Sequence, residues 1–414
     1  MKFYLLYLRH KKLISNFSYL AILQLITLFL PLLMYPYLIR VLGTDVYGKV
    51  IYSQAIIAYF SIIINYGFNI SATKDVSINR DDKERLSEII SSVFFVKLFL
   101  WAVSFCCILM LILLVEKFRD DYVLYLLTFG VCFYELFFQQ FFFQGIEEMK
   151  YITLINAFSR ISCFILVFVF VNECNDYLLV PLLNTLGGII GGAVTFYIIY
   201  VKKGIKLRLQ PICVILNYFN ESTPFFLSRF SSVVVHRTNT VLIGSFIGYV
   251  EVSYYDLAQK ILTVMLIPFD LLNQVLYPNV ARNKNMYLVK KIILLSLVIC
   301  VFMYVSLLIF QYPIIKLLAG VELLPAIPLI DLLCISIFIL STSYFLGNTM
   351  LVVMGYAKLF NRSVVDTSII YLVLVLLLLV FRVVNVYSLV IISLMVDLLC
   401  MLYRFVSAYK YKLL

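Results

Sequence analysis

The sequence predicts an all-α, polytopic integral membrane protein with about twelve transmembrane helices in two six-helix lobes. Three observations support this fold class. Hydrophobic residues make up 64% of the 414 residues and charged residues only 13%, whereas about a quarter of the residues in a soluble globular protein are charged. Long apolar runs recur along the whole chain, and a weak internal similarity relates its two halves.

Each predicted span is a mostly apolar run of about 20 residues, the length of helix that crosses about 30 Å of hydrocarbon. The first half of the chain has six such runs, near residues 17–39, 46–69, 87–115, 122–143, 151–172 and 177–201. The second half has six more, near residues 221–247, 252–280, 288–312, 326–354, 359–381 and 386–406. The first run is too long for a cleaved signal peptide and no cleavage site follows it, so we expect this helix to be retained.

The basic residues predict the orientation of the chain. Most of the 33 lysine and arginine residues lie near the two ends and in alternate loops, and short basic loops stay in the cytoplasm. Both termini are therefore expected to be cytoplasmic, in a multi-pass membrane protein. The formal net charge of +11 follows from these loops and their contact with anionic membrane lipids, so we expect no nucleic-acid partner.

A polar stretch after the sixth predicted span divides the chain. It reads K-K-G-I-K-L-R-L-Q-P over residues 202–211, and it predicts an N-terminal lobe over residues 1–205 and a C-terminal lobe over residues 206–414. Residues 43–54, G-T-D-V-Y-G-K-V-I-Y-S-Q, are echoed half a chain later by residues 248–259, G-Y-V-E-V-S-Y-Y-D-L-A-Q. Both segments lead from a predicted extracytoplasmic turn into a span, as expected for parallel repeats. Chance similarity between apolar segments is the alternative.

Basic residues inside the seventh predicted span are the main candidate site. Arg229, His236 and Arg237 fall at i, i+7 and i+8, which places them on one helical face. A cation near the bilayer centre costs about 3 kcal/mol, so such residues usually face a water-filled path or a substrate. We therefore predict a substrate-binding stripe for an anionic substrate. Alternatively, each cation pairs with an acidic residue such as Glu135 or Asp331, or reaches an interface.

Other charged residues within the spans offer further candidates. Lys97, in the third span, either adds to the same positive field or extends its side chain to the cytoplasmic side. Asp256 and Lys260 stand at i, i+4 in the eighth span, the spacing of an ion pair in which each neutralises the other. If Asp256 titrates instead, the pair is a candidate for coupling transport to an ion gradient.

Sequence signatures of cofactor, metal and enzyme sites were sought without result. The nine cysteines show no C-x-x-C spacing, so we expect no metal site. The chain also lacks a phosphate-binding glycine loop, the H-E-x-x-H pattern and the G-x-S-x-G pattern. We expect neither a cofactor nor catalysis, and we expect transport to be driven by an ion gradient or by consumption of the product.

Several blocks of the sequence, in order along both halves, resemble polysaccharide-export flippases of the Wzx type. These flippases belong to the multidrug/oligosaccharidyl-lipid/polysaccharide exporter superfamily. The matching blocks are P-Y-L-I-R-V-L-G-T-D-V-Y-G (36–48), Q-A-I-I-A-Y-F-S-I-I-I-N-Y-G-F-N-I-S-A-T-K-D (54–75), F-F-Q-G-I-E-E-M-K-Y-I-T (142–153), T-P-F-F-L-S-R (223–229) and S-Y-Y-D-L-A-Q-K-I (253–261). Arg229 is carried over as a substrate-binding residue because it lies inside one of these blocks.

The resemblance implies two lobes around a central cavity and the translocation of undecaprenyl-diphosphate-linked oligosaccharide, such as an O-antigen repeat unit, from the cytoplasmic to the periplasmic leaflet. It also implies partners in polysaccharide assembly, namely a polymerase and a chain-length regulator. The alternative in the same structural class is a cation-coupled multidrug exporter, which would favour an acidic cavity. A membrane-bound glycan polymerase or acyltransferase is a third hypothesis, and the short predicted periplasmic loops argue against it.

Overall fold

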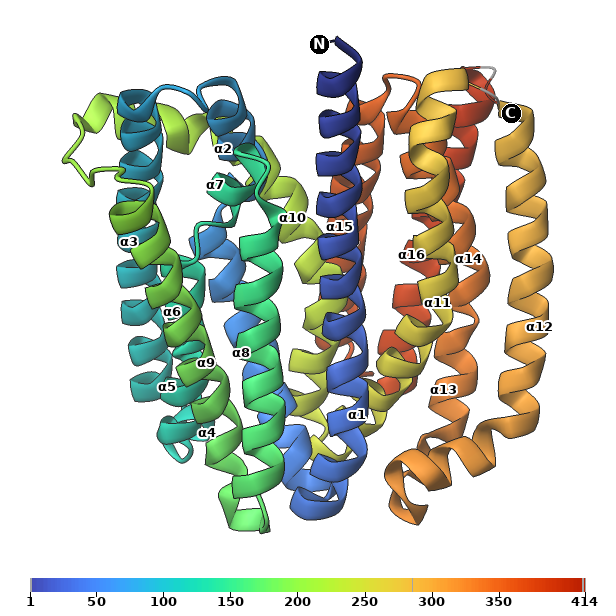
Figure 1. Cartoon of the computed structure of the whole chain (residues 1–414). Helices are drawn as coiled ribbons and strands as arrows, with labels where there is room; N and C mark the ends of the chain where they lie inside the picture. Colours follow the sequence, from blue (N-terminus) through green and yellow to red (C-terminus); the bar gives the residue numbers. More distant parts are fainter. Residues whose placement is uncertain (1, 285, 412, 414) are drawn as a thin grey trace. The chain divides into compact units, whose positions relative to one another are not determined.

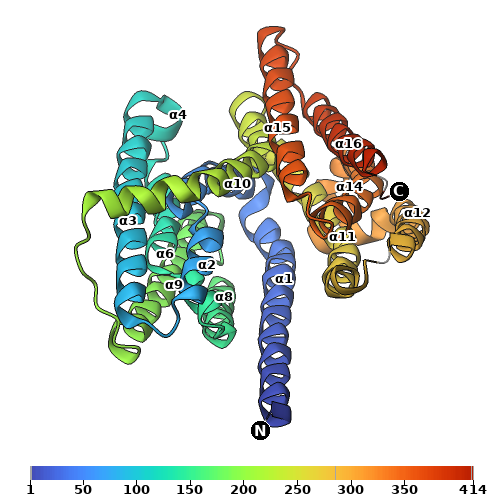
Figure 2. The ribbon, with the colours of Figure 1, turned by 90° about the horizontal axis from the view of Figure 1, so that it is seen from above.

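The computed structural model describes residues 2–284, 286–411 and 413, whose regular secondary structure is entirely helical (Figures 1 and 2). The chain forms two compact units. The first comprises Met1–Gly43 and Ile56–Phe230, and the second comprises Thr44–Ala55 and Ser231–Leu414. The predicted all-α class is therefore confirmed.

The first unit contains most of α1 and all helices up to the first part of α10. Their bounds are α1 (Lys2–Asn65), α2 (Phe68–Ile78), α3 (Lys83–Leu114), α4 (Glu116–Arg119), α5 (Tyr122–Phe129), α6 (Val131–Phe137), α7 (Gln140–Gly145), α8 (Met149–Phe170), the 3₁₀ helix η1 (Cys174–Leu178), α9 (Leu179–Phe196) and the π-helix η2 (Tyr197–Lys202). Helices α6 and α8 both pack on α9 (Figure 2). Glycines allow this approach, because a Cβ atom at Gly187 would lie 2.8 Å from Ser159 Oγ and one at Gly192 would lie 2.7 Å from Phe137 Cβ.

The second unit contains the rest of α10 and every later helix. Their bounds are α10 (Ile212–Phe246), α11 (Tyr249–Asn283), α12 (Met286–Ala319), the 3₁₀ helix η3 (Val321–Ala326), α13 (Ile327–Cys334), α14 (Ser336–Tyr344), the π-helix η4 (Phe345–Val352), α15 (Ala357–Val380) and α16 (Val386–Lys410). Helix α16 packs on α14 and α15, and α11 packs on α13 and α14. These helices form the polar interior described below.

The compact units differ from the predicted lobes of residues 1–205 and 206–414. The first part of α10 belongs to the first unit because Tyr66 stacks on Phe219 and Phe226, with ring centroids 4.3 and 4.5 Å apart. Ser71 and Ser222 are also joined by a hydrogen bond of 2.7 Å. The segment Thr44–Ala55 belongs to the second unit, so the chain enters that unit twice. The compact units are therefore divided at other residues than the polar stretch, and the two six-helix lobes stay a prediction.

Nine helical stretches of the described residues are long and apolar enough to cross a membrane. The first of them, Ser18–Ile78, contains two predicted spans, 17–39 and 46–69, separated by non-helical dihedral angles at Gly43 (φ 75°, ψ 167°). Eight further predicted spans match the remaining stretches to within a few residues. Helices α10 and α11 contain the other two predicted spans and are not among the nine, and both carry several charged side chains. The chain is a multi-pass membrane protein, and the count of twelve spans stays a prediction.

Candidate functional site

The three basic residues predicted on the seventh span are exposed on α10. Arg229 lies in the first unit, and His236 and Arg237 lie in the second. Among the residues that the structure describes, none of the three has a hydrogen-bond or ion-pair partner. Among the described residues, neither Glu135 nor Asp331 forms an ion pair with any of the three basic residues. The alternative of neutralising ion pairs is therefore not observed.

His236 lines two cavities inside the second unit, with volumes of about 220 and 150 Å³. We call them the second-unit cavities. Both are lined by His236 from α10, Tyr344 from α14 and Asp397 from α16. Tyr344 ends the regular α-helix, and the wider turns of η4 follow it, a kind of irregularity that is frequent at functional sites. A basic residue and a carboxylate therefore line both second-unit cavities.

A buried hydrogen-bond network fixes the part of α10 that carries His236 and Arg237. Asn239 donates to Ser393 Oγ (2.6 Å) and to the hydroxyl of Tyr255 (3.1 Å), and its Oδ1 accepts from the hydroxyl of Tyr371 (2.6 Å). Gln259 donates to Tyr255 at 2.8 Å. One amide thus connects α10 to α11, α15 and α16. Because a buried amide is costly to leave unpaired, this network holds the helix in one register.

Arg404 of α16 lines the larger second-unit cavity and is only 6% exposed. Its Nε donates to Ser363 Oγ at 3.1 Å, and its Nη1 donates to the carbonyl (3.1 Å) and hydroxyl (2.8 Å) oxygens of Ser343. The guanidinium carbon lies 4.5 Å from the ring centroid of Phe360, a cation–π distance. The side chain of Arg404 thus lies in the interior of the second unit.

Lys97 is completely buried in the first unit, and its side chain does not extend to the cytoplasmic side. Its ammonium donates to the carbonyl oxygen of Glu135 at 3.0 Å and lies 5.8 Å from the ring centroid of Phe141. In a continuous helix the Glu135 carbonyl would accept from the N–H of Gln139, but α6 ends at Phe137. Lys97 thus replaces the missing donor at a helix break, which is a structural role. The substrate-binding role stays a prediction.

The carboxylate of Glu135 accepts from Asn65 Nδ2 at 2.9 Å. Lys97, Glu135 and Asn65 therefore bring α3, α6 and α1 together in one polar cluster of the first unit. The predicted span over residues 122–143 matches the helical stretch Tyr122–Gly145. Within that stretch the structure has three short helices, α5, α6 and α7.

The ion pair expected from the spacing of Asp256 and Lys260 is present in the second unit. Tyr47 completes it, because its hydroxyl donates to Asp256 Oδ2 at 2.7 Å and accepts from Lys260 Nζ at 3.0 Å. The two side chains are 15% and 21% exposed. The neutralising interpretation of this spacing is therefore confirmed, and the ion-coupling role stays a prediction.

The two segments of the internal echo pack against each other. Ser253 donates to the carbonyl of Thr44, and Gly48 lies so close to Tyr249 that a Cβ atom would collide with the Tyr249 carbonyl. Tyr47 belongs to the first segment and Asp256 to the second. This packing explains why Thr44–Ala55 belongs to the second unit.

Sequence reasoning found the exposed cations and missed most of the polar interior around them. Asn239 is uncharged, so an apolar run conceals it. Asp397 is one of several carboxylates within the predicted spans, and its charge alone does not distinguish it. A signal does exist in the spacing of Ser393 and Asp397 at i, i+4 on α16, which puts two polar groups on one helical face.

Comparison with known families places the chain among proteins of glycan assembly. Residues 13–284 match the family described as polysaccharide biosynthesis protein. The protein named "Putative O-antigen transporter" of Escherichia coli (strain K12) is 27% identical over 282 residues, which cover 68% of each chain. One of the same name from Shigella dysenteriae is 26% identical over 258 residues, covering 61% of this chain and 63% of that protein.

Solved structures of one transporter superfamily share the fold. An inward-facing multidrug resistance MATE family transporter of the MOP superfamily superposes with a TM-score of 0.74 and 13% identity, covering 96% of this chain and 98% of the other. A MOP superfamily transporter from Pyrococcus furiosus superposes with a TM-score of 0.65 and 13% identity, covering 97% of this chain and 95% of the other. The lipid II flippase MurJ superposes with a TM-score of 0.63 and 14% identity, covering 96% of this chain and 87% of the other. At these identities the likeness establishes the fold alone.

Proposed function

The chain belongs to the polysaccharide biosynthesis protein family, and on that premise we propose that it is a flippase for a lipid-linked oligosaccharide. The proposed substrate is an undecaprenyl-diphosphate-linked repeat unit, such as that of an O-antigen. It would move from the cytoplasmic to the periplasmic leaflet of a bacterial inner membrane by alternating access. The names of the two relatives in Escherichia coli and Shigella dysenteriae support this class of substrate.

The observation that carries the proposal is the set of exposed, unpaired basic residues on α10. A polar glycan cannot cross hydrocarbon unaided, and its diphosphate adds negative charge that must be offset. Arg229 and Arg237 have donors free among the described residues, and a guanidinium matches a phosphate through two parallel hydrogen bonds. The same residues disfavour a multidrug exporter, because a cationic drug would be repelled.

The test is complementation of a chromosomal deletion with wild type, Arg229→Ala, Arg229→Lys or Arg237→Ala at matched expression. We measure surface polysaccharide and the leaflet in which the lipid-linked repeat units reside. Loss of one charged hydrogen bond should slow translocation about tenfold, and Arg229→Lys should recover part of the rate. Arg362→Ala is the matched control, because this exposed arginine of α15 pairs with Asp366 at 3.2 Å.

Each outcome assigns a function. Accumulation of repeat units on the cytoplasmic face in the deletion, uncorrected by the two alanine variants, supports the flippase. Normal surface glycan with raised drug sensitivity would replace it with the multidrug exporter. Units that reach the periplasm but remain unpolymerised would point to a polymerase.

A further inference from the structure

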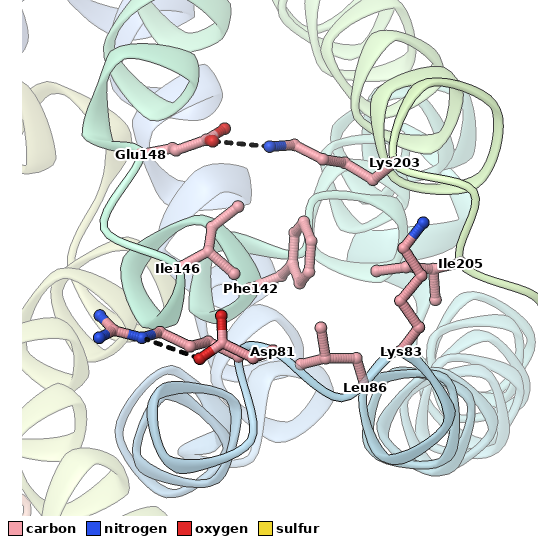
Figure 3. Close-up of a pocket in the computed structure, with 9 residues that line it drawn as sticks. Asp81, Lys83, Leu86, Phe142, Ile146, Glu148, Lys203 and Ile205 are labelled. Carbon is pink, nitrogen blue, oxygen red and sulfur yellow. Dashed lines mark hydrogen bonds and ion pairs between the residues drawn. The ribbon is translucent and has the colours of Figure 1, made fainter.

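A pocket of about 450 Å³ lies at one end of the first unit (Figure 3). It forms where α3 begins, where α8 begins and where η2 ends. Successive spans alternate in direction, so these three helix ends lie on the same side of the membrane, which the basic loops predict to be cytoplasmic. This prediction puts the pocket near the lipid headgroups of the cytoplasmic side.

The pocket has an apolar floor and a charged rim. Leu86, Phe142 and Ile205 form the floor, and each is less than 5% exposed within the core of the first unit. The rim carries the basic residues Arg80, Lys83 and Lys203 and the acidic residues Asp81 and Glu148. Figure 3 shows Glu148 and Lys203 facing each other across the pocket, with Lys83 below Lys203 and beside Ile205.

Most of the charges on the rim are paired. Lys203 Nζ lies 2.6 Å from Glu148 Oε1, and Arg80 lies 3.8 Å from both Asp81 and Glu147. Lys83 is exposed and has no partner among the residues that the structure describes. Its ammonium lies near Gly204, because a Cβ atom on that glycine would be 3.9 Å from it. The pocket thus holds one uncompensated positive charge.

The segment that follows Lys203 has the composition of a membrane-interface segment. After a left-handed turn at Gly204 (φ 67°), the chain runs along α3, where Ser87 donates to the carbonyl of Lys206 and the N–H of Arg208 donates to Ser91 Oγ at 3.1 Å. Apolar side chains between these basic residues are exposed, namely Leu207 (40%), Leu209 (86%) and Ile212 (74%). Exposed apolar side chains interleaved with basic ones are typical of a segment at a membrane interface.

We propose that this pocket binds the phosphate group of an anionic lipid. The Lys83 ammonium contacts the phosphate, and the apolar floor receives the first carbons of the lipid. Two lipids carry the required phosphate ester, a membrane glycerophospholipid and an undecaprenyl-diphosphate carrier. The site does not rest on the proposed flippase activity, because either lipid is present in a bacterial membrane.

The test is lipid binding to the purified full chain by native mass spectrometry. Dioleoyl phosphatidylglycerol and undecaprenyl diphosphate are titrated in parallel, with dioleoyl phosphatidylcholine as the lipid without net charge. We compare wild type with Lys83→Ala, Lys83→Arg and Arg85→Ala. Arg85 is the matched control, because it also lies in the first turn of α3 but pairs with Glu88 at 3.0 Å and lines a different pocket.

Lys83→Ala should weaken binding of one anionic lipid about fivefold, the effect of one basic residue near a lipid surface. Lys83→Arg and Arg85→Ala should leave binding near the wild-type level. The lipid whose binding depends on Lys83 identifies the source of the phosphate. Equal losses in Lys83→Ala and Arg85→Ala would mean diffuse surface attraction and overturn the proposal. Displacement of the lipid by millimolar sodium phosphate would also overturn it, because the site would then bind a free anion.

Discussion

Lys97 in the first unit and Arg404 in the second are the buried basic side chains among the residues that the structure describes, and they are held in different ways. Lys97 of the first unit is fully enclosed, and its ammonium donates a hydrogen bond to a backbone carbonyl, that of Glu135. Arg404 of the second unit has three hydrogen bonds to two serines and borders a cavity of about 220 Å³. The first cation donates to a carbonyl left free at a helix break, whereas the second borders a cavity.

The difference follows from the chemistry of the two side chains. A lysine ammonium is a compact point charge, which suits a single carbonyl left free at a helix break. The planar guanidinium of arginine presents a fork of donors, and at Arg404 this fork connects α16 to α14 and α15. Water can enter a polar cavity but cannot reach Lys97 without local opening. We expect the first unit to depend more on its buried cation than the second.

The largest effect should come from Lys97→Met. Removing the ammonium leaves the Glu135 carbonyl without a donor and the Glu135 carboxylate without a nearby positive charge. Removing one partner of two opposite charges in a protein interior costs up to about 3–5 kcal/mol, and here Lys97 is buried and Glu135 half-buried. The variant should therefore show a large loss of thermal stability in detergent, together with reduced expression.

A double substitution separates the two causes. Lys97→Met combined with Glu135→Gln removes the buried negative charge as well, so part of the lost stability should return. Glu135→Gln alone keeps the Lys97–carbonyl hydrogen bond and tests the carboxylate by itself. Unchanged thermal stability in Lys97→Met would show that the lysine does not hold the helix break.

Arg404→Met should lower the free energy of unfolding by less, about 1–3 kcal/mol. The serine hydroxyls that lose their donor can turn to water, because the residue borders a cavity. Hydrogen exchange should locate the change. Exchange should be faster than in the wild type in α15 and α16 and unchanged in α3. Arg362→Met is the control on α15, since its ion pair with Asp366 is exposed. Equal losses of stability in Arg404→Met and Lys97→Met would contradict the expectation that the first unit depends more on its buried cation than the second.

The sequence predicts features that are visible within one span. Arg229, His236 and Arg237 stand out because charge is rare in an apolar run, and the Asp256–Lys260 pair follows from helical spacing alone. The helix break that explains Lys97 is different. It lies at Phe138 and Gln139, between α6 and α7, in a run of phenylalanine and glutamine with no glycine or proline to mark it.

Features that depend on packing between distant segments could not be predicted. The burial of Arg404 requires Ser343 and Ser363 from two other helices, and residue spacing within α16 carries no information about them. The division into units likewise depends on contacts of Tyr66 with α10 and of Thr44–Ala55 with α11. The basic linker 202–211 separates the predicted lobes along the sequence, but packing decides where the units divide.

The smallest effect should come from Asp256→Asn, which distinguishes the two interpretations of the Asp256–Lys260 pair. The pair is partly exposed, so its loss should cost about 1 kcal/mol or less, and Tyr47 can still hydrogen-bond to Lys260. If Asp256 only neutralises Lys260, the double variant Asp256→Asn with Lys260→Met should support surface polysaccharide at the wild-type level. If Asp256 titrates during coupling, the single and double variants should both fail. Tyr47→Phe is the control, because it keeps the ion pair and removes one hydroxyl, and complementation of the deletion strain measures all four chains.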